Sequence, residues 1–180
     1  MKKILVVVVC IVGLLSAKNL KGSFGMGIGW SPLAYVGARD FPTPDFVITK
    51  IGVSDKIIIE PLIGFDFTSY SNGASESGSL IQLQGILGYI FREHKKTNIY
   101  LKGGIGFMVE SPPGDTPYSS AFGIGIPFGF GLEHFFSDYF SINLDAFSGF
   151  SFININDPDG SETSFSLGNH KIFISLMWYY

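Results

Sequence analysis

The residues of this sequence that could do chemistry are charged side chains set singly among alternating apolar residues. In each segment the large apolar residues share one parity and the charged residue has the other. Folding as strands would therefore bring the charges to a common face. Three cations and five carboxylates in one narrow space stay charged only if they pair. The pattern predicts a polar network that closes this space to bulk flow, or that only holds strand register, formed by Lys50, Glu60, Asp66, Lys102, Glu110, Glu133, Asp145 and Lys171.

Catalytic and metal-binding chemistry has weaker support. His94 and His134 fall at or beside expected turns, and His170 lies early in the last expected strand. Ser148 lies on an apolar face with no histidine in register, although a nucleophilic serine needs an adjacent base. No metal-ligand spacing occurs, and a formal charge of −3 does not suit a nucleic-acid-binding face. We expect no enzyme activity, no metal, no cofactor and no nucleic-acid partner.

The composition indicates a membrane barrel or another buried β-structure. Apolar residues make up 46% of the 180 residues and aromatic residues 16%, whereas charged residues are only 15%. An ordinary soluble domain has about 25% charged residues. After the N-terminus no run of about 18 apolar residues occurs, so no spanning helix accounts for this hydrophobicity.

The N-terminus has the features of a secretory signal peptide. Lys2 and Lys3 form a basic region, residues 4–15 form an apolar region, and Ala17 is a small residue at the expected cleavage point. We therefore divide the chain into a signal peptide, residues 1–17, and one barrel domain, residues 18–180. Cleavage would remove the only cysteine, Cys10, and leave no disulfide.

Period-two alternation recurs along the rest of the chain and predicts eight strands. They are expected at residues 18–30, 46–53, 57–70, 80–92, 99–110, 121–134, 140–152 and 165–180. The connections alternate between long and short, and the long ones cover residues 31–45, 71–79, 111–120 and 154–164. With both termini at one end, all long loops lie at the other, as in outer-membrane barrels with short periplasmic turns.

The two faces of the expected strands differ in size as well as polarity. Between residues 122 and 132, Phe, Ile and Leu alternate with Gly and Pro. The lumen of an eight-stranded barrel is only just wide enough to be filled by side chains. So many large residues cannot all point inward, as they would in a lipocalin-like barrel. We expect an all-β fold, an eight-stranded antiparallel up-and-down transmembrane β-barrel with its apolar face toward lipid.

The chain resembles the small eight-stranded outer-membrane barrels of diderm bacteria, the OmpA-transmembrane-domain and OmpX-like class. The resemblance rests on the signal peptide, the eight alternating strands, the phrase F-G-F-G-L-E-H-F-F-S-D-Y at residues 128–139 and the aromatic C-terminus. It implies a monomer in the cell outer membrane whose partners are lipid, lipopolysaccharide, periplasmic chaperones and the barrel-insertion machinery. The family's C-terminal insertion signal maps onto Ile172, Ile174, Leu176, Trp178 and Tyr180.

Two features depart from this resemblance. Pro61 and Pro127 fall within expected strands, where a ladder donor is lost and a barrel has no free edge. We expect a bulge or a bound water at each. No periplasmic domain is expected after residue 180, so the resemblance does not support a peptidoglycan-anchor role.

The expected role is structural, or one of surface interaction through loops that bind a cell or an extracellular ligand. Loops carry variable function on a rigid scaffold, and the candidate contact residues are Tyr35, Arg39, Phe41 and Tyr118. The alternative for these side chains is a place in the interfacial aromatic girdle. A narrow porin-like channel for small solutes is the second functional hypothesis, and a membrane-embedded lipid-modifying enzyme is the weakest.

Overall fold

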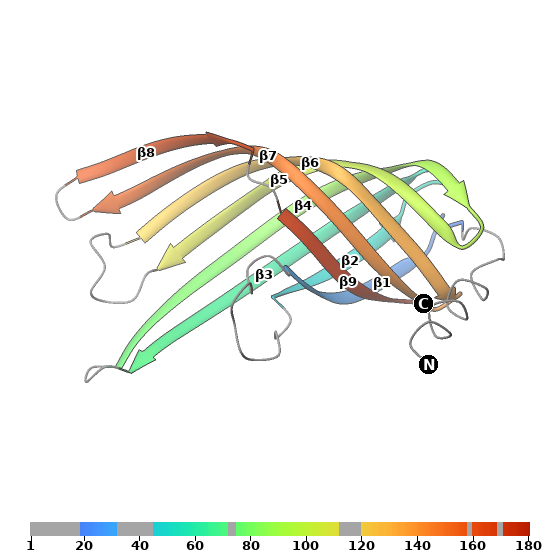
Figure 1. Cartoon of the computed structure of the whole chain (residues 1–180), viewed down its shortest axis with the longest axis horizontal. Helices are drawn as coiled ribbons and strands as arrows, with labels where there is room; N and C mark the ends of the chain where they lie inside the picture. Colours follow the sequence, from blue (N-terminus) through green and yellow to red (C-terminus); the bar gives the residue numbers. More distant parts are fainter. Residues whose placement is uncertain (1–18, 32–44, 72–74, 112–119, 158–159, 169–170) are drawn as a thin grey trace, which may run out of the picture.

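The computed structural model describes residues 19–31, 45–71, 75–111, 120–157, 160–168 and 171–180 (Figure 1). Within these ranges the chain forms nine strands: β1 (Phe24–Trp30), β2 (Phe46–Gly52), β3 (Ile57–Ser71), β4 (Ser75–His94), β5 (Thr97–Ser111), β6 (Ser120–Ser137), β7 (Phe140–Asp157), β8 (Gly160–Leu167) and β9 (Lys171–Tyr179). No helix in the described part of the chain is long and apolar enough to cross a membrane. The predicted signal peptide lies outside the described residues.

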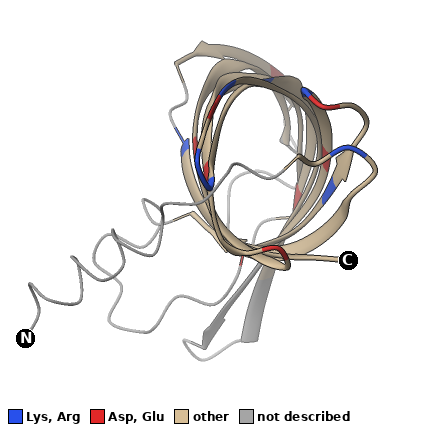
Figure 2. Ribbon diagram, turned by 90° about the vertical axis from the view of Figure 1, so that its right-hand side faces the viewer, with Lys and Arg blue, Asp and Glu red and all other residues tan. Residues whose placement is uncertain are grey.

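The strands close into an antiparallel barrel. β1 to β6 pair in chain order, β9 pairs with β1 and with the first half of β7, and β7 pairs with β6 to complete the ring. Figure 2, which looks along the barrel, shows this ring. The expected all-β fold and eight-stranded antiparallel barrel are confirmed, with β9 as the eighth member of the ring.

The long-hairpin end of the barrel differs from the sequence prediction. β3 and β4 remain paired as far as Ser71 and Ser75, and β7 and β8 as far as Asp157 and Gly160. The loops expected at 71–79 and 154–164 are therefore largely strand. Their polar residues pair through the backbone without the apolar alternation by which we identified strands. β8 ends beside Gly168, whose φ of 91° is a left-handed conformation that glycine adopts easily.

The two mid-strand prolines do not produce bulges, so that part of the expectation was wrong, and the alternative of a bound water stays a prediction. The β2–β3 pairing lapses beside Pro61 and resumes in the same register, and the β5–β6 pairing does the same beside Pro127. A proline removes a ladder donor, but the strand need not gain a residue to accommodate the loss. Register shifts occur near the short turns instead, between Ile90 and Arg92 and between Phe135 and Ser137.

Large apolar side chains cover the outside of the barrel. We call the following exposed set the outer band: Phe24, Met26, Val47, Ile51, Ile59, Ile63, Phe65, Ile81, Leu83, Leu87, Tyr89, Leu101, Ile105, Phe107, Val109, Phe122, Ile126, Phe128, Phe130, Leu132, Leu144, Phe150, Phe152 and Trp178. Along each strand, the positions between these residues on the same face carry no Asp, Glu, Lys or Arg. Lys50, Glu60, Lys102, Glu133 and Asp145, which have the other parity on the same strands, are buried in the lumen.

Candidate functional site

Five charged side chains meet in the half of the lumen near the short turns. They come from five different strands: Lys50 from β2, Glu60 from β3, Lys102 from β5, Glu133 from β6 and Asp145 from β7. We call them the ionic network. Each is at most 4% exposed, so the network is removed from bulk water. The alternating direction of side chains along a strand points each of them inward.

The ionic network is a continuous chain of ion pairs. Lys50 Nζ lies 3.0 Å from Glu60 Oε1 and 2.8 Å from Glu133 Oε2. Lys102 Nζ lies 2.6 Å from Glu60 Oε2 and 2.7 Å from Asp145 Oδ1. Glu60 therefore joins the two lysines, and each lysine binds a second carboxylate. Because buried charges are costly unless paired, removing one member would leave its neighbours uncompensated.

Neutral polar side chains complete the network. Three hydroxyl groups donate to Glu133: Tyr100 at 2.6 Å, Tyr179 at 2.5 Å and Ser141 at 2.6 Å. Asn143 donates to Asp145 Oδ2 at 2.5 Å. These donors matter because the network holds three carboxylates and only two ammonium groups, a formal charge of −1 (2 − 3). These four donors were not predicted as network residues, although they have the same inward parity as the charged residues.

Gly131 makes room for the pair of Lys102 and Asp145. It lies on β6 opposite Asp145. A Cβ atom at this position would meet Asp145 Oδ1 and would lie 2.7 Å from Lys102 Cε. No larger residue fits there unless the ion pair shifts.

Apolar side chains enclose the ionic network on both sides. Towards the short turns lie Leu20, Ile58, Ile90 and Phe135, all at most 2% exposed. Towards the long hairpins lie Phe147 and Phe173, whose ring centroids are 5.9 Å apart. We call these two residues the aromatic floor. Phe46 packs edge-on against Phe173, with their ring centroids 5.1 Å apart. The ionic network is therefore buried between two groups of apolar side chains.

Three of the eight predicted network residues lie elsewhere. Asp66 is on β3 opposite Leu80, and its side chain is outside the described part. Glu110 is half-buried on β5, opposite Leu80 and Ala121. Lys171 begins β9 and is exposed. All three are nearer the long-hairpin end than the ionic network is.

The remaining candidate residues form no catalytic arrangement among those described. His94 ends β4, and His134 Nδ1 lies 2.9 Å from Thr97 Oγ1 across β5 and β6. No group of three His, Cys, Asp or Glu in the described ranges is placed to hold a metal ion. His170 and the loop residues Tyr35, Arg39, Phe41 and Tyr118 lie outside these ranges. Absence of enzyme activity stays a prediction.

The residues assigned to the insertion signal share the outer face of β9. Ile172, Ile174 and Leu176 are half-buried, whereas Trp178 and Tyr180 are exposed. Their inward neighbours Phe173, Ser175, Met177 and Tyr179 are buried. This arrangement leaves one face of the last strand to the surroundings and one to the lumen.

A family model described as "Domain of unknown function (DUF2715)" matches residues 20–170, which include all five members of the ionic network. No curated relative matches the chain.

Proposed function

The chain belongs to the family described as Domain of unknown function (DUF2715), and from this premise we propose that it is an outer-membrane β-barrel with a closed lumen. Its role is structural or one of surface interaction, in which the barrel holds its long hairpins outside the cell. The signal peptide exports the chain, and residues 172–180, in β9 and directly after it, contact the insertion machinery. The resemblance to the OmpA-transmembrane-domain and OmpX-like barrels supports this role.

The observation that carries the proposal is the contrast between the two faces of the barrel wall. The outer band is apolar and carries no charged residue, whereas the five members of the ionic network are buried in the lumen. A barrel dissolved in water would present its polar face outward. A lipid-facing surface requires the arrangement found here.

The position of the connections supports an orientation in the membrane. The turns after β2, β4 and β6 are short and lie at the end where the C-terminus lies (Figure 1). The extended hairpins β3–β4 and β7–β8 lie at the other end. Outer-membrane barrels place short turns in the periplasm and longer loops outside. We therefore orient the ionic network towards the periplasm.

A narrow channel for small solutes is the second candidate. A cavity on the long-hairpin side of the aromatic floor favours it, because part of the lumen is open. The ionic network and the apolar residues around it oppose it. A membrane-embedded lipid-modifying enzyme would need a base near Ser148, and the described residues place no histidine beside it.

Cell fractionation and gel migration test the proposal. We expect the protein in the outer-membrane fraction, and we expect the folded form in detergent to migrate differently on a gel before and after boiling. A protein that fractionates as a soluble periplasmic species and shows no such shift would contradict the membrane assignment.

A further inference from the structure

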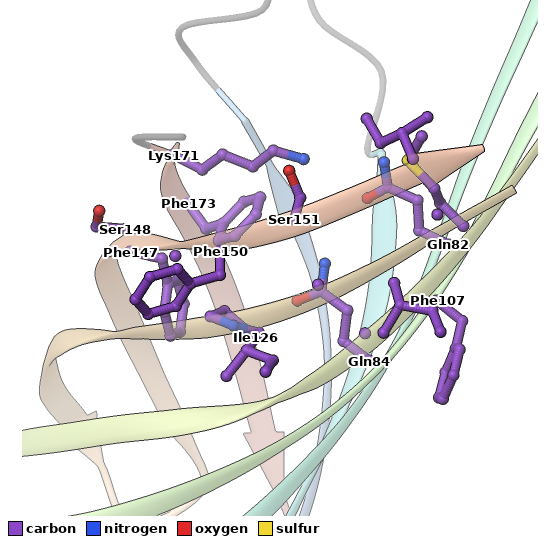
Figure 3. A pocket seen from close by; sticks show the side chains of 18 residues that line it. Gln82, Gln84, Phe107, Ile126, Phe147, Ser148, Phe150, Ser151, Lys171 and Phe173 are labelled. Atoms are coloured by element: carbon purple, nitrogen blue, oxygen red, sulfur yellow. The ribbon is translucent and has the colours of Figure 1, made fainter. Parts of the chain in front are cut away.

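The half of the lumen near the long hairpins contains a cavity that lies apart from the ionic network. We call it the upper pocket; its volume is about 130 Å³. Phe147 and Phe173 of the aromatic floor line it on the side of the network. Figure 3 shows Lys171, Ser151, Gln82 and Gln84 around the same space. The pocket therefore has an apolar base and a rim of polar side chains.

Lys171 is the chemical feature that sets this pocket apart. Within the described part of the chain it makes no ion pair, whereas Lys50 and Lys102 each make two. Gln82 and Gln84, both half-buried on β4, add amide groups that can donate or accept hydrogen bonds. Ser151 is already hydrogen-bonded to Ser166 at 2.6 Å.

We propose that the upper pocket binds a small organic anion with an apolar body. The anionic group would pair with Lys171, and the apolar body would rest against the aromatic floor and Met108. A ligand site typically combines an apolar lining with a few polar groups that fix orientation. A cavity of about 150 Å³ holds benzene, so the apolar body is no larger than about one ring.

Three probes with the same ring and different head groups test this inference on the purified, folded barrel in detergent. They are phenylacetate, 2-phenylethanol and phenethylamine, and binding is followed by chemical shifts of the backbone amides of β4, β7 and β9. We expect phenylacetate to bind about two- to fivefold more tightly than 2-phenylethanol, the range for one solvent-exposed ion pair, and phenethylamine to bind least. Equal binding of all three, or preference for the amine, would overturn the inference.

Substitution of Lys171 assigns the preference to one side chain. Lys171→Gln should remove the preference for phenylacetate over 2-phenylethanol, whereas Lys171→Arg should keep it. Lys56→Gln is the matched control, because Lys56 is an exposed lysine at the short-turn end. Retention of the preference in Lys171→Gln would overturn the inference. The binding test does not depend on cellular location or on conductance, so its failure is distinct from failure of the proposed function.

Discussion

The two halves of the lumen use charge in opposite ways. Near the short turns, five charged groups from five strands pair with one another and lie between apolar layers. Near the long hairpins, Lys171 is exposed at the edge of a cavity and makes no ion pair within the described residues. The charges of the first half are paired within the protein, whereas we propose that Lys171 in the second half pairs with a solute.

The proposed closure of the lumen and the proposed binding site thus lie in different halves of one barrel. The ionic network connects side chains of β2, β3, β5, β6 and β7 across the lumen. These strands are not all neighbours in the barrel. Residues that line the upper pocket could be substituted without loss of these ion pairs. Substitutions in the ionic network should therefore lower the stability of the barrel more than substitutions in the upper pocket.

Lys50→Met should be the most damaging substitution. It leaves Glu60 and Glu133 buried without their shared cation, and removal of one partner from a buried pair costs about 3–5 kcal/mol. Urea unfolding in lipid vesicles, followed by tryptophan fluorescence, measures the change. Lys56→Met is the control, because its pair with Glu93 is exposed and is worth about 0–1 kcal/mol. Equal losses of unfolding free energy in the two variants would show that the buried ion pairs are no more important than the exposed one.

Arginine substitutions on β4 compare the two sides of the barrel wall. Leu83 is 50% exposed in the outer band, and Gln84 faces the upper pocket. Leu83→Arg should cost about 2 kcal/mol or more, because it places a charge in lipid. Gln84→Arg should cost less than about 1 kcal/mol, since the lumen there has room. The same unfolding assay applies, and a larger cost for Gln84→Arg would argue against a lipid-facing outer band.

Gly131→Ala tests whether the ionic network is tightly packed. The added methyl group would meet both Lys102 and Asp145, and overpacking of this kind costs about 1–3 kcal/mol. At Gly85 a Cβ atom meets nothing within 4 Å, so Gly85→Ala is the matched control and should be close to neutral. If both variants unfold at the same urea concentration, the network has more freedom than the distances indicate.

Lys171→Met should have the smallest effect on stability. Lys171 is exposed, and substitutions of this kind usually change stability by less than about 0.5 kcal/mol. The unfolding midpoint in vesicles should match that of the unsubstituted protein. A loss comparable to that of Lys50→Met would mean that Lys171 belongs to the closure, and the distinction between the two halves would fail.

The parts of the structure that the sequence predicts all follow from the alternation of side chains along each strand. The period-two pattern was enough for the strands, the apolar outer face and the inward direction of Lys50 and Glu133. Parity reports the face of a strand and not the height along the barrel, which depends on register. It therefore grouped Lys171 with residues that the structure places in the other half of the lumen.

Strand extensions without apolar alternation, and contacts that depend on strand register, could not be predicted from the sequence. The β3–β4 and β7–β8 extensions consist largely of Ser, Gly, Asn and Thr, so their pairing has no signature in alternation. The space made by Gly131 depends on Lys102 and Asp145, which come from two neighbouring strands. Such a requirement becomes visible only once the register is known.

Conductance in planar lipid bilayers tests the closed lumen most directly. The purified barrel is reconstituted alone, and a known porin in the same bilayers serves as the positive control for insertion. We predict no stable open level for this protein, because the ionic network and its apolar layers fill the lumen near the short turns. A wide, stable channel from the unsubstituted protein would contradict the account.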